Sequence, residues 1–99
     1  MTDVELIVLP GGEIVLKGLA DLRAGLVSED ALLILIARRR LIEHGFDVLA
    51  PKNVERPYEH RLYESIERRM PKGAHSEYNA LIQRIVSFEN ALDHTHKQN

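Results

Sequence analysis

Residues 31–37, Ala-Leu-Leu-Ile-Leu-Ile-Ala, form an unbroken apolar run that stops at residues 38–40, Arg-Arg-Arg. Ser28 offers a side-chain oxygen that can cap a helix, and the two acidic residues after it place negative charge where the helix dipole favours it. Gly45 supplies a stop signal. Taken alone, the apolar run could also form a β-strand, but the cap, the length and the Leu, Ala and Arg content favour a helix. We therefore expect one helix over residues 29–44, with the core built around it.

Length and composition indicate a single domain over residues 1–99, because 99 residues with 44% hydrophobic content suffice for one core. The absence of cysteine excludes a disulfide framework, a thiolate zinc site and a cysteine nucleophile. The N-terminus carries acidic residues instead of a basic stretch, and no apolar run approaches the ~20 residues that cross a bilayer. We expect a cytoplasmic protein without a membrane segment, and a polar tail over residues 94–99 that frays.

The N-terminal region reads as a β-hairpin. Val4–Leu9 and Glu13–Lys17 are rich in Val, Ile and Leu, and the Pro10-Gly11-Gly12 segment between them contains glycines that can take the positive φ of a tight reversal. Phe46–Leu49 is a possible third short strand, which ends before a proline that favours extended geometry.

Two more helices are expected in the second half of the chain. Pro57–Met70 begins with a proline suited to the first helical position and repeats large apolar residues every fourth position. From Ser76 to Asp93 the apolar residues follow the i, i+3, i+4, i+7 pattern of an amphipathic helix. We expect these two helices to form an antiparallel hairpin. The predicted fold class is α+β, with three main helices packed on the β-hairpin.

Self-association is the interaction that the pattern favours. A lone two-stranded hairpin is marginal in water, and the striped helices present more apolar faces than one small core buries. We expect that a second copy of the chain covers these apolar faces and that the protein is a homodimer. The alternative is that a different protein covers them. The sequence thus favours a non-catalytic interaction or regulatory module.

Two charged residues interrupt apolar stripes at the helical period. Arg38 shares a helix face with apolar neighbours, and Glu89 does the same in the last helix. A buried charge is costly unless it is paired, so one hypothesis is that Arg38 and Glu89 meet as an ion pair, inside the fold or across a dimer interface. The alternative is that each stripe widens toward solvent and Arg38 extends its charged end to the surface.

A nucleic-acid interface is the second functional hypothesis. The net charge is −2, but residues 36–75 carry nine bases and six acids. A protein that binds nucleic acid needs a basic surface to neutralise the phosphates. Five glutamates in the same stretch argue against a nucleic-acid interface there. The candidate anion or nucleic-acid contacts are Arg39, Arg40, Lys52, Arg56, Arg61, Arg68, Arg69 and Lys72.

An enzyme is the third hypothesis, acting through Arg38 or Arg39 with His44 or His60. The Arg39-x-x-x-x-His44 spacing is similar to the motif of HEPN-type RNA-cutting proteins, in which Arg and His flank the scissile phosphate. The arginine that follows Arg39 and the predicted hairpin depart from that family, so we do not assign it. The sequence predicts no catalytic residue, metal site or cofactor.

Overall fold

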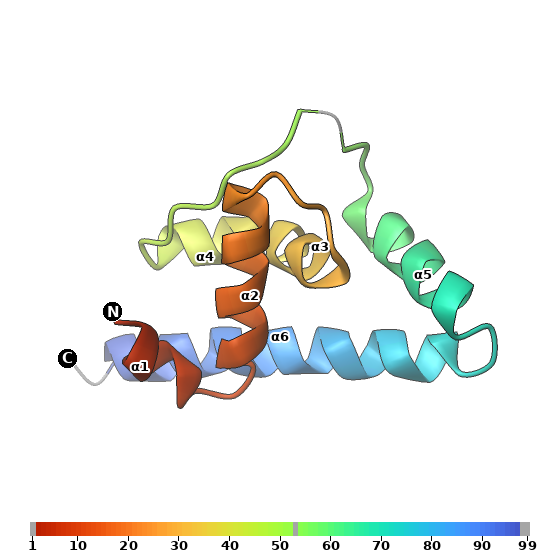
Figure 1. Ribbon diagram of the computed structural model, residues 1–99. Helices are drawn as coiled ribbons and strands as arrows, with labels where there is room; N and C mark the ends of the chain where they lie inside the picture. Colours follow the sequence, from red (N-terminus) through yellow and green to blue (C-terminus); the bar gives the residue numbers. More distant parts are fainter. Residues whose placement is uncertain (1, 53, 98–99) are drawn as a thin grey trace.

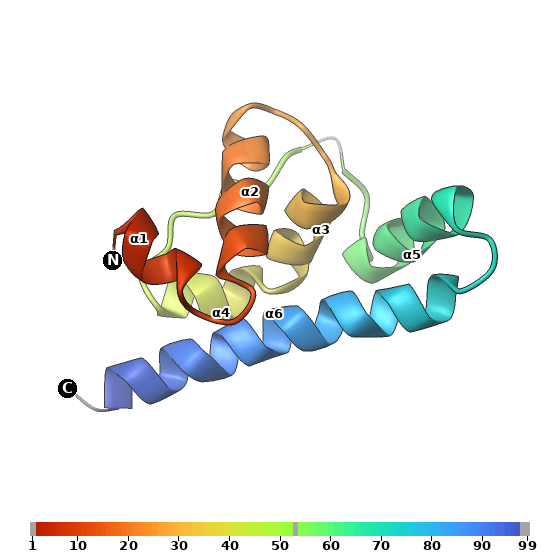
Figure 2. The same cartoon turned by 60° about the horizontal axis from the view of Figure 1, so that its bottom comes forward.

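The computed structural model describes residues 2–52 and 54–97, and this part of the chain folds into six helices without a strand. Figures 1 and 2 show α6 running the length of the molecule, with the other helices on one side of it. The molecule measures 43 × 29 × 21 Å. In chain order the helices are α1 (Asp3–Ile7), α2 (Gly12–Arg23), α3 (Glu29–Ile36), α4 (Arg38–Glu43), α5 (Tyr58–Arg69) and α6 (Ala74–Lys97).

The apolar run forms α3, which is the central helix of the fold. Ala31 to Leu35 are buried in succession, with exposed fractions of 5% or less, because α2, α5 and α6 surround α3. A helix that is apolar on all sides needs such an environment. Its N-terminus has the expected cap, since the Ser28 hydroxyl oxygen accepts a hydrogen bond from the Ala31 amide at 3.1 Å.

The predicted fold class is wrong, because the segments expected to form a hairpin are helical. Val4–Leu9 lies largely in α1, and Glu13–Lys17 is the first half of α2. Gly11, with φ of 75°, begins α2 instead of closing a hairpin turn. The buried positions of α2 are Gly12, Ile14, Val15, Gly18, Leu19 and Leu22. From Ile14 onward they follow a helical spacing, which continues past the point where the second strand was expected to end.

The close approach of α2 and α3 depends on Gly18. A Cβ atom at this position would lie 2.4 Å from Ile34 Cγ1 and 2.6 Å from the Asp30 carbonyl oxygen. Such distances are far below van der Waals contact, so only glycine allows the two helices to pack at this separation.

The possible third strand and the single helix over residues 29–44 are also corrected. Phe46–Leu49 has no strand pairing; Phe46 packs edge-on against Phe88 at 6.3 Å between ring centroids, and Val48 is buried. The helix is interrupted at Ala37, whose backbone is not helical and which separates α3 from α4.

The last two helices occur where they were predicted. They are joined by the turn at residues 70–73, in which Gly73 has φ of 95°. Their axes splay apart from this turn instead of lying closely antiparallel, because α3 occupies the space between them (Figures 1 and 2). The tail expected to fray at residues 94–99 is helical as far as Lys97, and residues 98–99 lie outside the described part of the chain.

Candidate functional site

A groove of about 510 Å³ lies between α4 and the start of α5. The connection from α4 to α5 runs back past α2 and α3 and brings Arg56 and Tyr58 toward α4 (Figure 1). The end of α3 contributes Leu35 and Ile36 to the lining, and α4 contributes Ile42. The groove therefore combines elements that are distant in sequence.

Three arginines and two glutamates border this groove. The Nε atom of Arg38 donates a hydrogen bond to the Val48 carbonyl oxygen at 3.0 Å, which holds the side chain against the connection. The guanidinium carbon of Arg56 lies 5.8 Å from the centre of the Tyr58 ring, in cation–π geometry. Arg39 is 94% exposed and lies 3.7 Å from Glu43, a weak surface pair.

Arg38 and Arg56 are the cations of the groove that lack a carboxylate partner. Neither makes an ion pair with any residue in the described ranges 2–52 and 54–97. Beside them, Ile42 is 44% exposed. The groove thus places unneutralised positive charge next to uncovered apolar surface.

A second cluster of charged groups connects α4 to the last turns of α6. The Nε atom of Arg40 lies 3.6 Å from the Glu89 carboxylate, and its Nη2 atom donates to Asp93. The Nε2 atom of His44 lies 2.7 Å from the other oxygen of Asp93. Burial raises the pKa of Glu89, an effect that Arg40 opposes.

The ion pair predicted between Arg38 and Glu89 is therefore replaced, within the chain, by one between Arg40 and Glu89. Glu89, whose burial the sequence left open, is buried, with 7% of its surface exposed. Arg38 and Arg40 are two positions apart in α4 and therefore point to opposite sides of the helix, so that Arg40 pairs with Glu89 of α6 and Arg38 lines the groove.

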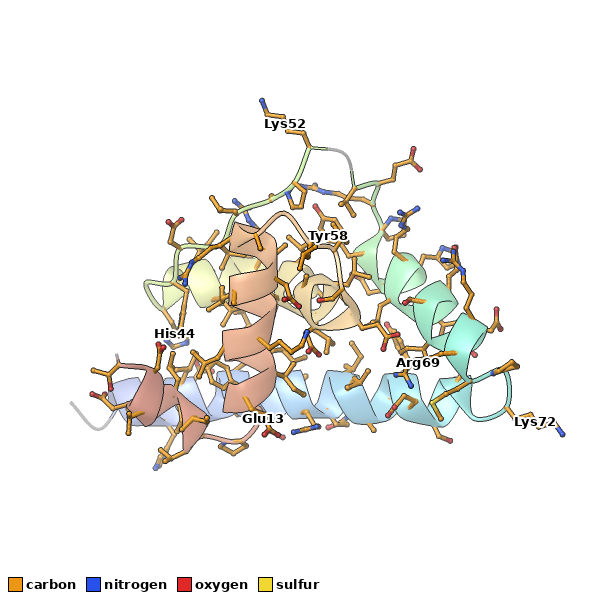
Figure 3. The ribbon with its side chains drawn as sticks, in the orientation of Figure 1. Glu13, His44, Lys52, Tyr58, Arg69 and Lys72 are labelled. Carbon is orange, nitrogen blue, oxygen red and sulfur yellow. The ribbon has the colours of Figure 1, made fainter. Side chains whose placement is uncertain are left out.

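The remaining basic candidates do not form one surface. Figure 3 shows Lys52 and Lys72 projecting from separate corners of the molecule, with Arg69 between α5 and α6. Arg68 pairs with Glu64 at 3.8 Å and borders a small pocket together with Arg61. The groove between α4 and α5 brings together Arg39 and Arg56 of these candidates, with Arg38.

Arg69 belongs to a network that joins α5 to α3 and α6. Its Nη2 atom lies 2.7 Å from the Glu29 carboxylate and 3.3 Å from that of Glu77, and the Ser65 hydroxyl also donates to Glu29. Hydrogen bonds from Arg69 hold the pKa of Glu29 below its usual value. This geometry gives Arg69 a structural role.

The residues of the enzyme hypothesis do not share a cleft. Arg38 and Arg39 border the groove, whereas His44 contacts Asp93 and His60 lines a separate shallow pocket with Tyr63 and Tyr78. Within the described residues, no three or more His, Asp or Glu side chains are placed to hold a metal ion.

A patch of exposed apolar side chains covers α1. Val4, Ile7 and Val8 are 74%, 55% and 76% exposed, whereas Leu6 of the same helix is buried. The exposed face went unnoticed in the sequence because an alternating strand was expected there, and such a strand exposes a different set of residues.

The groove could not be found from sequence either. Its lining residues come from three helices and a connection, and no spacing in the chain marks their convergence. No helix in the described ranges is both long and apolar enough to cross a membrane. Comparison with known proteins finds no matching family model and no matching curated protein or solved structure.

Proposed function

We propose that this protein is a small cytoplasmic interaction module without catalytic activity, which works as a homodimer through the exposed face of α1. The observation that carries the proposal is the exposure of Val4, Ile7 and Val8 within two turns of one helix. Large aliphatic side chains scattered singly on a surface are ordinary, but a contiguous patch is typical of an interface.

A second copy of the chain is the occupant that suits this patch. The residues of α1, Asp3–Ile7, include no basic side chain, and a two-fold axis places the same apolar patch of both copies face to face. Asp3 and Glu5, which lie on the same helix, remain at the solvated rim in such an arrangement.

The area of the patch limits the affinity of the dimer. Full burial of a Val or Ile side chain contributes about 1.5–3 kcal/mol. Three side chains from each copy, roughly two-thirds exposed, then contribute on the order of 6–12 kcal/mol. Association costs about 4–15 kcal/mol, and the favourable ends of the two ranges leave about 8 kcal/mol, which corresponds to a reversible dimer with a dissociation constant in the micromolar range.

Sedimentation velocity over a range of protein concentration tests the proposal. The wild-type protein should shift from monomer to dimer as concentration rises, and Val8→Asp should remain monomeric because a charge cannot be buried at the two-fold axis. Leu26→Asp is the matched control, since Leu26 is 57% exposed and lies beyond the opposite end of α2 from α1. Circular dichroism shows that both variants are folded.

Two results would contradict the proposal. One is a wild-type protein that stays monomeric up to about 1 mM, well above the expected dissociation constant. The other is a Val8→Asp variant that dimerises as well as the Leu26→Asp control, which would place any interface elsewhere.

A further inference from the structure

We propose that the groove between α4 and α5 binds a small amphipathic anion, a molecule with an apolar or aromatic body and a single carboxylate, phosphate or sulfonate. This inference is independent of the dimer, because no residue of α1 lines the groove within the part of the chain that the structure describes.

The charge of the groove selects an anion. Arg38 projects from α4 and Arg56 from the segment before α5, so the two cations approach the groove from two of its sides. The hydrogen bond to Val48 uses one of the five N–H donors of the Arg38 guanidinium. A carboxylate or phosphate placed between the two arginines receives charge-assisted hydrogen bonds, which are stronger than those between neutral groups.

The apolar lining requires more than an inorganic ion. Ile42 is 44% exposed at the groove, beside Leu35 and Ile36 at the end of α3. An inorganic phosphate leaves this surface in contact with water, whereas an alkyl chain or aromatic ring covers it. The juxtaposition of arginines and aliphatic side chains therefore fits a ligand with two chemically different ends.

The size of the groove favours a small molecule. Its volume of about 510 Å³ lies within the ~300–1,000 Å³ that is typical of pockets for drug-sized ligands. The two glutamates at its border, Glu43 and Glu59, disfavour a ligand with several negative charges, such as a stretch of nucleic acid.

The fluorescent probe 8-anilinonaphthalene-1-sulfonate has this chemistry, with two aromatic groups and one sulfonate. The chain contains no tryptophan, so the probe signal is free of that background. We expect a saturable rise in fluorescence at one site per chain. Decanoate and decyl phosphate should displace the probe and distinguish a carboxylate from a phosphate preference, whereas decanol and inorganic phosphate should not displace it.

Two pairs of variants test the two ends of the ligand. Arg56→Gln should weaken probe binding about ten-fold through the loss of charge-assisted contacts. Arg61→Gln should leave it unchanged, because Arg61 is exposed on α5 outside the groove. Ile42→Gln should also weaken binding, whereas Leu49→Gln, at a position 52% exposed outside the groove, should not.

Amide chemical shifts in a ¹H–¹⁵N titration locate the probe. Shifts at Ile42 and Tyr58 support the proposal, and shifts centred on Val4 and Val8 overturn it, because they place the probe on the patch of α1. The proposal is also overturned by the absence of saturable binding, by equal displacement with decanol and decanoate, or by equal affinity of the Arg56→Gln and Arg61→Gln variants.

Discussion

Replacing Gly18 by alanine should destabilise the protein, although alanine is the better helix former. Gly18 is buried in α2, and the added methyl group would lie 2.4 Å from Ile34 Cγ1 and 2.6 Å from the Asp30 carbonyl oxygen. The first contact is with a side chain that can adjust. The second is with the backbone of α3, which cannot move without separating the two helices.

The magnitude follows from two opposing effects. Alanine at an interior helix position is favoured over glycine by about 1 kcal/mol. Overpacking of a core costs typically about 1–3 kcal/mol, and we take the upper end because one of the contacting atoms belongs to the backbone. The free energy of unfolding should therefore fall by about 2 kcal/mol, which lowers Tm by about 8–16 °C in a domain of this size.

Urea denaturation followed by circular dichroism measures this change. Ala20→Gly is the matched control, because Ala20 is exposed in the same helix and its replacement changes only helix propensity, by about 1 kcal/mol. The double variant Gly18→Ala/Ile34→Ala separates the two contacts. Its loss of stability should be smaller than the sum of the single losses, since removal of Ile34 Cγ1 relieves one of the two clashes.

Whether Gly18→Ala lowers or raises the free energy of unfolding decides whether α2 and α3 pack as closely as the structure shows. Without a clash, Gly18→Ala stabilises the protein by roughly the amount that Ala20→Gly destabilises it, about 1 kcal/mol. A Gly18→Ala variant as stable as the wild type, or more stable, would refute the close packing of α2 against α3.

Three further predictions concern the charged clusters and a helix cap. Burial raises the pKa of Glu89, so the folded state holds this proton more tightly than the unfolded chain. The stability of the wild type relative to Glu89→Gln should therefore fall as the pH rises from about 4, the ordinary pKa of a glutamate, through the raised pKa; in urea titrations, a rise would contradict the burial. The pKa of Glu29 is lowered by Arg69, so Arg69→Gln should lower the urea midpoint at neutral pH more than Arg68→Gln does. The difference between the two variants should disappear as the pH falls below about 4 and through the lowered pKa of Glu29, because the carboxylate is then protonated. A difference that does not depend on pH would argue against the ion pair between Arg69 and Glu29. Ser28→Ala should cost about 1 kcal/mol in thermal melts, because the first turn of α3 loses its cap, and an unchanged Tm would show that the cap is dispensable.

Local sequence signals located the helices whose ends carry caps or turns. Ser28 and Pro57 each lie one residue before the first residue of α3 and α5, and the last helix, expected from Ser76, begins two residues earlier at Ala74. These signals succeed because caps and turns involve backbone groups within a few residues of one another.

The secondary structure of the N-terminal segments was predicted wrongly because short runs of Val, Ile and Leu suit a strand and a buried helix equally. The helical spacing of α2 extends from Ile14 to Leu22, and a window that ended at Lys17 concealed it. The two glycines at residues 11–12 suggested a hairpin turn, whereas Gly12 is required by the close approach of the Leu6 carbonyl oxygen.

The sequence by itself predicted that the apolar run after Ser28 is helical and central to the core, and residues 31–36 of that run lie in α3, because a helix with apolar side chains on every side is favourable only where other helices surround it. It also placed Glu89 on an apolar stripe, but it left open whether this residue is buried. Which arginine meets Glu89 was decided by the tertiary structure, since the pair of Arg40 with Glu89 joins α4 to α6, which are far apart in the sequence. Arg38 points to the opposite side of α4 and lines the groove with Arg56, because the direction of a side chain depends on the phase of its helix and its neighbours depend on how distant helices pack.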